Sequence, residues 1–280
     1  YFVQDYEPFF QPLSADYVAA AQTYRLGLGH ITLGPWLAEH IATRFGGRAR
    51  AIDFGVEHAL YRPAAGDGRG GAATAARPRI VFYARAVTPR RGVALGLAAL
   101  AQLAARRPDV EIVLYGGEPA HVAAPFPHAQ AGVLDGPALA DLYRSATVGL
   151  ALSYTNLSFV PLEMMACGLP VVVAATEPAA WLQHDGVNCA VAEPTADGLA
   201  AALEALLDDP ARRRRLAEGG RAAVAGLSWE RSVAQFVAHV DAYVAEDRAA
   251  VAAGVELDTA AGGADTVGDA TSGRVAGRAP

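Results

Sequence analysis

The chain has 280 residues, 52% of them apolar, which is enough for one large domain or two modest ones with a sizeable core. Its net charge of −6 argues against general binding to nucleic acid or to anionic membranes. The cysteines, Cys167 and Cys189, have no metal-ligand spacing and no disulfide framework. No signal peptide or membrane-spanning apolar run is evident. We therefore expect a cytoplasmic protein and leave open peripheral association with the inner face of the plasma membrane.

The first 54 residues predict part of a parallel α/β domain. Strands are expected at 1–4, 31–33 and 49–54, and helices at 17–26 and 35–45. Asp16 is the expected cap of the first helix, and Pro35 opens the second. Helices between strands are the crossovers that parallel pairing needs. Three strands are too few for an independent domain here, so residues 1–54 are interpreted as the C-terminal part of an N-terminal domain, and the chain looks truncated upstream.

A second α/β series follows a linker over 55–78 that is rich in Gly, Ala and Arg. Its strands are predicted at 79–84, 110–115, 148–152, 171–173 and 190–192. Its helices are predicted at 93–106, 137–145, 161–168, 178–183, 197–207 and 211–225. This alternation predicts a doubly wound parallel sheet over 79–228. A closing helix is expected over 229–246 and a disordered tail over 247–280.

Residues 155–173 form the most informative stretch, a polar loop followed by a short helix and a buried strand. Pro161 is expected to open the helix and Gly168 to end it. A helix start can hold a phosphate, and Glu163 in its first turn could reach a sugar or ribose hydroxyl. Acidic residues are also common there without any function. The backbone N–H groups of Ser158, Phe159 and Val160 would bind a phosphate or would only cap the helix. The Phe159 side chain would wall a ligand or join the core.

Three arginines follow the strand predicted at 79–84. Ligands of open α/β sheets bind beyond the carboxyl ends of the strands, where Arg85 lies. Arg85 and Arg91 are predicted to clamp a diphosphate and to stabilise it as a leaving group, whereas Arg90 is expected to face solvent. The alternative is that all three are solvated loop charges. Gly116, after the strand at 110–115, would let a ligand approach the backbone, although a tight turn explains it as well.

No metal site is expected, because the sequence has no Asp-x-Asp pair, and His121 and His128 lack a ligand spacing. The arginines and the helix start would neutralise a diphosphate instead. Arg212–Arg215 are interpreted as a solvated helix face. No other nucleotide-binding or nucleophile motif is evident.

Residues 49–246 resemble the donor half of a family 4 glycosyltransferase with the two-domain GT-B fold. The most specific motif is 161–172, Pro-Leu-Glu-Met-Met-Ala-Cys-Gly-Leu-Pro-Val-Val. Further similar segments are 52–57 with 61–63, 84–92, 139–143, 185–188 and the helix start at Trp229. The resemblance implies a Rossmann-like donor domain at 79–228 and places 1–54 in an acceptor domain.

The opening residues 1–8 and Thr23-Tyr24 are similar to the WsaF-type rhamnosyltransferases. This resemblance implies a dTDP-L-rhamnose donor, a rhamnan or other surface-glycan acceptor, lipid-linked or free, and retention of anomeric configuration. It assigns Glu163 to the ribose hydroxyls and Arg85 and Arg91 to the diphosphate. Thr155 stands where the family has a first glutamate, and a threonine cannot be an anionic partner for the transferred sugar. The alternatives are a nucleotide-binding fragment without transfer activity and, less favoured, a sugar-nucleotide epimerase.

Overall fold

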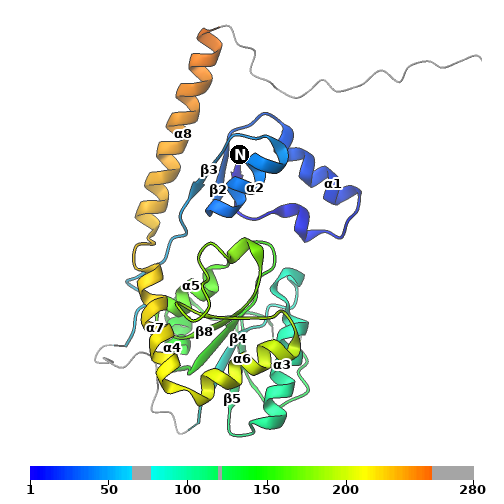
Figure 1. Cartoon of the computed structure of the whole chain (residues 1–280), viewed down its shortest axis with the longest axis vertical. Helices are drawn as coiled ribbons and strands as arrows, with labels where there is room; N and C mark the ends of the chain where they lie inside the picture. Colours follow the sequence, from blue (N-terminus) through cyan, green and yellow to red (C-terminus); the bar gives the residue numbers. More distant parts are fainter. Residues whose placement is uncertain (65–76, 119–121, 254–280) are drawn as a thin grey trace, which may run out of the picture.

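The computed structural model describes residues 1–64, 77–118 and 122–253 and contains two parallel sheets, each with its own helices (Figure 1). The smaller sheet lies before residue 55 and the larger one after residue 78. The fold class predicted from the sequence, α/β with a doubly wound parallel sheet and part of a second one, is confirmed.

The N-terminal unit is a three-stranded sheet in the order β1-β2-β3, with strands Phe2–Val3, His30–Leu33 and Ala49–Ile52. Helix α1, Ala15–Gln22, connects the first pair and α2, Pro35–Phe45, the second. The prediction that Asp16 caps α1 is wrong: Ser14 Oγ accepts the N–H of Tyr17 at 3.3 Å. Pro35 begins α2 as expected, because its missing N–H costs nothing in a first turn.

The larger sheet has the strand order β6-β5-β4-β7-β8-β9, all parallel. Its strands are Arg79–Tyr83 (β4), Glu111–Tyr115 (β5), Ala129–Gly132 (β6), Val148–Ala151 (β7), Val171–Ala174 (β8) and Ala190–Ala192 (β9). After β4, the chain adds β5 and β6 on one side of this strand and then β7, β8 and β9 on its other side. This reversal next to β4 creates the switch point where α/β sheets bind ligands.

Helices cover both faces of this sheet. They are α3 (Val93–Arg106), α4 (Gly136–Ser145), α5 (Phe159–Ala166), α6 (Ala196–Asp208) and α7 (Pro210–Val224). Side chains alternate across β4, so Ile80 and Phe82 pack in the core with α3 and α6 while Val81 packs in the core with α4 and α5. The helix predicted at 178–183 is wrong: only a 3₁₀ turn at Glu177–Ala179 forms.

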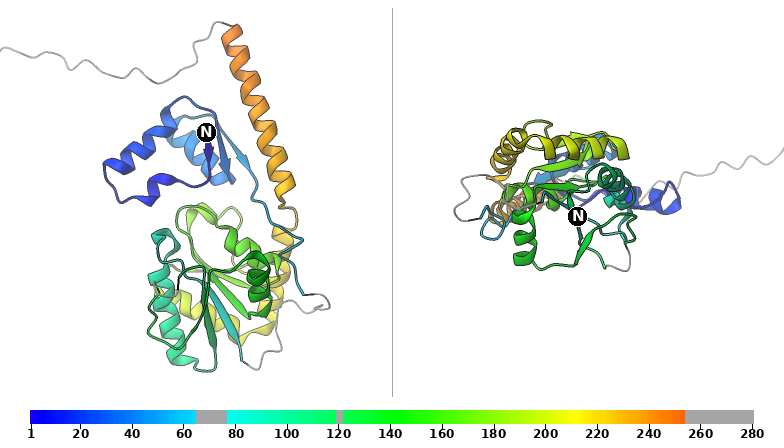
Figure 2. Two further views of the ribbon diagram at one scale, coloured as in Figure 1. Left: turned by 180° about the vertical axis from the view of Figure 1, so that it is seen from behind. Right: turned by 90° about the horizontal axis from the view of Figure 1, so that it is seen from below.

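The closing helix α8 runs from Trp229 to Ala252, which corrects the predicted end at 246 and the tail predicted from 247. The rest of that tail, 254–280, and linker residues 65–76 lie outside the described residues. Figures 1 and 2 show α8 crossing back beside the N-terminal unit. Tyr243 Oη donates to His30 O at 3.0 Å and Ser232 Oγ to Asp53 O at 2.8 Å. The last helix therefore ties the two units together.

Candidate functional site

The arginine loop, residues 85–92, leaves the carboxyl end of β4 at the switch point. Arg85 is exposed, and Arg91 is half-buried with its Nη1 donating to Ser153 Oγ at 3.1 Å. Burial lowers the pKa of the Arg91 guanidinium, and the neighbouring Arg90 lowers it further. Neither Arg85 nor Arg91 forms an ion pair with any residue that the structure describes. The loop therefore presents positive charge that a bound anion would neutralise.

Arg90 does not face solvent, and that prediction is wrong. Its Nε lies 3.4 Å from Asp5 Oδ2, and its guanidinium carbon lies 4.2 Å from the centre of the Phe10 ring. Both partners belong to the N-terminal unit. The sequence could not indicate this pairing, because residues 5 and 90 are brought together only when the two units meet.

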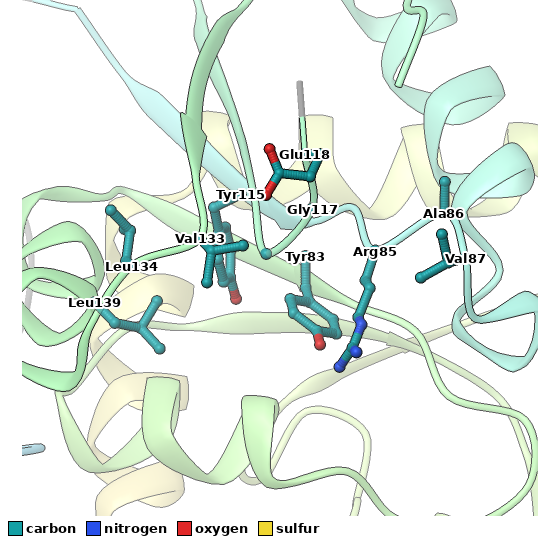
Figure 3. Close-up of a pocket in the computed structure, with 11 residues that line it drawn as sticks. Tyr83, Arg85, Ala86, Val87, Tyr115, Gly117, Glu118, Val133, Leu134 and Leu139 are labelled. Atoms are coloured by element: carbon teal, nitrogen blue, oxygen red, sulfur yellow. The ribbon is translucent and has the colours of Figure 1, made fainter. Parts of the chain in front are cut away.

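A cavity of about 480 Å³ opens beside the arginine loop, at the carboxyl ends of β4 and β5 (Figure 3). Its wall includes the side chains of Tyr83, Tyr115, Val133, Leu134 and Leu139, together with Arg85, Ala86, Val87, Gly116, Gly117 and Glu118. The volume and the mainly apolar lining are typical of a small-molecule site. The sequence pointed to Arg85 and Gly116 but missed the two tyrosines, which read as ordinary strand residues.

Gly116 forms the tight turn that was one of the two roles considered for it. Its φ of +85° is the left-handed turn that favours glycine, and its N–H donates to Gly132 O at 2.7 Å. A Cβ atom at this position would lie 2.2 Å from Cε2 of Tyr83. Glycine therefore lets the turn form and keeps the Tyr83 ring in place in the cavity wall.

Helix α5 begins at Phe159, two residues before the predicted Pro161, so Glu163 lies beyond the first turn and that expectation is corrected. Ser158 is the cap, and its Oγ accepts the N–H of Val160 at 3.3 Å. The Phe159 ring contacts Phe54 at 5.1 Å between ring centres, which agrees with the core interpretation of this side chain. Ser158 and Phe159, at the start of α5, do not line the cavity, and Phe159 lies against the N-terminal unit.

Glu163 is held in a cluster of tyrosines. Tyr143 Oη donates to Glu163 Oε2 at 3.4 Å, and the hydroxyls of Tyr143 and Tyr115 lie 3.0 Å apart. Burial raises the pKa of Glu163 to about 7, partly opposed by the hydroxyls of Tyr143 and Tyr61. Glu163 does not line the cavity itself, but Tyr115 belongs to both the cavity wall and the cluster. The carboxylate is therefore linked to the cavity through hydroxyl groups.

Thr155 and Asn156 are buried in the loop between β7 and α5, with exposed fractions of 2% and 3%. The Thr155 Oγ1 atom makes no hydrogen bond of normal geometry with a described residue. Asn156 donates to Gln4 O at 2.9 Å and to Leu33 O at 3.1 Å, both in the N-terminal unit. Sequence reasoning singled out Thr155 and missed Asn156, whose partners are more than a hundred residues away.

Within the described ranges, no group of three or more His, Cys, Asp or Glu side chains could hold a metal ion. His121 lies outside those ranges, and Cys167 and Cys189 are both free and buried. Among the helices described, none combines the length and apolar character needed to cross a bilayer.

Residues 78–204 match the family described as WsaF, C-terminal domain. The O-antigen biosynthesis protein RfbC of Myxococcus xanthus is 37% identical over 237 residues, which are 83% of this chain and 18% of that protein. A D-inositol 3-phosphate glycosyltransferase of Salinispora arenicola is 31% identical over 66% of this chain and 48% of its own length. The chain thus spans less than half of each of these relatives.

Solved structures share the fold. A sucrose-phosphate synthase of Thermosynechococcus elongatus superposes with a TM-score of 0.69 at 22% identity, covering 86% of this chain and 66% of the other. The HepE protein of Anabaena, solved with UDP and glucose, gives a TM-score of 0.65 at 18% identity over 86% of this chain and 71% of its own. Residues 78–204 therefore belong to the WsaF C-terminal domain family, and the chain has the GT-B fold and resembles family 4-type glycosyltransferases.

Proposed function

We propose that the protein transfers a sugar from a nucleoside diphosphate donor to a glycan acceptor. The observation that carries this proposal is the position of Arg85 and Arg91. Their guanidinium groups, without an ion pair among the described residues, lie at the switch point beside an apolar cavity. An apolar cavity suits a base, and adjacent unpaired guanidinium groups suit a diphosphate.

In this proposal, the base occupies the cavity beside Gly116, and Glu163 accepts hydrogen bonds from the sugar of the nucleoside. Arg85 and Arg91 bind the diphosphate and stabilise the negative charge that develops on it as the glycosidic bond breaks. Removing one such contact typically costs about 3–4 kcal/mol in the barrier. The loop and helix start at Thr155, Ser158, Phe159 and Val160 lie on the side of the transferred sugar. No cofactor and no metal take part.

For the donor we propose dTDP-L-rhamnose, transferred with retention to a surface glycan or its lipid-linked precursor. The match to the WsaF C-terminal domain supports this choice, and so does the relative described as an O-antigen biosynthesis protein. Thr155 supports it as well, because a hydroxyl in place of a carboxylate suits a sugar with one hydroxyl fewer. The reaction would take place in the cytoplasm, at the inner face of the plasma membrane.

The second candidate is a unit that binds the nucleotide and transfers nothing. One observation favours it: the chain corresponds to 18% of the RfbC protein. Incubation of this chain with dTDP-L-rhamnose and a rhamnan acceptor separates the two. Glycosyltransfer predicts a lengthened glycan and free dTDP, whereas the binding unit leaves the donor intact. A new sugar nucleotide formed without acceptor would identify an epimerase and contradict both.

Calorimetry tests the site itself, with dTDP, UDP and GDP titrated into the chain. We expect dTDP to bind most tightly, and Arg85→Ala and Arg91→Ala each to weaken it at least about tenfold, the usual worth of a charge-assisted hydrogen bond. Arg214→Ala on the exposed face of α7 is the matched control and should leave the affinity unchanged. If all three variants bound dTDP as tightly as the wild-type protein does, Arg85 and Arg91 would not be diphosphate ligands.

A further inference from the structure

The loop between β7 and α5, residues 152–158, contacts both units. The Asn156 amide donates to Gln4 O at 2.9 Å and to Leu33 O at 3.1 Å, at the carboxyl ends of two strands of the N-terminal unit. Its Oδ1 accepts the N–H of Leu157 at 2.8 Å. A buried amide with its donors and its acceptor engaged has one orientation, because any rotation would leave polar groups unpaired.

The same loop also holds the arginine loop. Arg91 Nη1 donates to Ser153 Oγ at 3.1 Å, and Ser153 Oγ donates to Asn156 O at 2.7 Å. In addition, the N–H of Tyr154 donates to Arg90 O at 3.2 Å. A continuous set of hydrogen bonds therefore runs from the N-terminal unit through Asn156 and Ser153 to the Arg91 guanidinium.

A second connection explains why Arg91 keeps its charge available. Asp5 pairs with Arg90 at 3.4 Å, and Phe10 packs on the same guanidinium at 4.2 Å. No ion pair joins Asp5 to Arg91 in the described part of the chain. The two neighbouring arginines thus differ in their surroundings: Arg90 is bound by the N-terminal unit, whereas Arg91 donates to the neutral Ser153 hydroxyl and lies 6.0 Å from the centre of the Tyr83 ring.

We propose that Asn156 is a positioning residue: it transmits the docking of the N-terminal unit, through Ser153, to the Arg91 guanidinium, and so sets the affinity for the β-phosphate of a nucleoside diphosphate. This inference rests on the proposed function. Arginine binds phosphate through a planar fork of N–H groups, so its contribution depends on orientation as well as on charge. Without the Asn156 anchor, Arg91 would keep its positive charge, but the orientation of its guanidinium group would no longer be fixed.

The test measures the β-phosphate increment, the ratio of the dissociation constants of dTMP and dTDP, by calorimetry. Asn156→Ala removes the anchor, and Ser153→Ala removes the connection to Arg91 while keeping both bonds to the N-terminal unit. We expect the increment to fall about tenfold in each variant, while the affinity for dTMP stays near that of the wild-type protein. A general loss of folding or packing would weaken the binding of dTMP and of dTDP alike, and would leave the ratio of their dissociation constants unchanged.

Trp36→Phe is the matched control. Trp36 Nε1 donates to Glu177 Oε1 at 3.1 Å, a contact between the units that does not touch the arginine loop. Its increment should equal that of the wild-type protein. The proposal is overturned if Ser153→Ala keeps the full increment, or if Trp36→Phe loses as much as Asn156→Ala. If the wild-type protein itself binds dTMP and dTDP equally, the diphosphate assignment and therefore the proposed function fail as well.

Discussion

Glu163 illustrates how burial changes the chemistry of a single side chain. Its side chain is partly buried, with Tyr143 as hydrogen-bond donor, and its pKa is raised from 4.5 to about 7, with burial as the largest cause. The folded protein therefore binds a proton at Glu163 more tightly than the unfolded chain does. Stability contributed by this group is present at low pH and is lost as the pH rises from about 4.5 to about 7.

Glu163→Gln should accordingly stabilise the protein at pH 8, by about 1–3 kcal/mol in the free energy of unfolding, and change it little at pH 5. Urea denaturation at the two pH values measures this difference. Tyr143→Phe removes a donor that lowers the pKa, so the pH at which stability falls should move upward. Glu218→Gln, on the exposed face of α7, is the control and should show no such dependence. Equal stabilisation at both pH values would contradict the raised pKa of Glu163.

At this scale the sequence predicts residues whose role depends on their place in one element. The position of Arg85 and Arg91 beyond the carboxyl end of β4 was predictable, because they follow a buried strand, and their binding to a ligand stays a prediction. Asn156 and Asp5 were not, because their partners belong to the other unit. The prediction that Arg90 faces solvent failed for the same reason, because the residues next to it in the sequence do not indicate its contact with Phe10.

Among the elements, the turn after β5 shapes the cavity most directly. Gly116→Ala would impose a positive φ on alanine and place its Cβ against the Tyr83 ring, whereas Gly132→Ala, at φ +66°, meets no atom within 4 Å. Both substitutions carry the backbone strain, so their difference isolates the packing of Tyr83. We expect Gly116→Ala to be less stable than Gly132→Ala by about 1–3 kcal/mol in chemical denaturation and to bind dTDP more weakly. Equal stability and equal affinity would show that the turn does not shape the cavity.

The errors at the scale of elements have physical causes. Strand β6, Ala129–Gly132, was missed because it is short, lacks β-branched residues and lies at the edge of the sheet. Helix α5 was expected to begin at Pro161, but Ser158 supplies a side-chain cap and so begins it at Phe159. Long periodic segments such as α3 and α6 were predicted well, because their apolar faces pack on the sheet.

At the scale of the whole molecule, the two units are joined by α8 as well as by the loop around Asn156. Arg50 packs on Tyr243 of α8 at 4.3 Å, and His239 Nε2 lies 2.9 Å from Ala51 O. Periodicity predicted this helix, but the surface that it covers depends on the arrangement of the two units. The resemblance to GT-B proteins implied two domains, but it did not indicate which residues of the N-terminal unit α8 contacts.

In the proposed function, the cavity at the switch point holds a nucleotide whose diphosphate lies on the arginine loop. A crystal structure of the chain with dTDP tests it most directly. We expect the base in the cavity beside Gly116 and the diphosphate oxygens about 2.7–3.2 Å from the guanidinium nitrogens of Arg85 and Arg91. A nucleotide bound elsewhere, for instance on the Arg212–Arg215 face of α7, with this cavity empty, would contradict it.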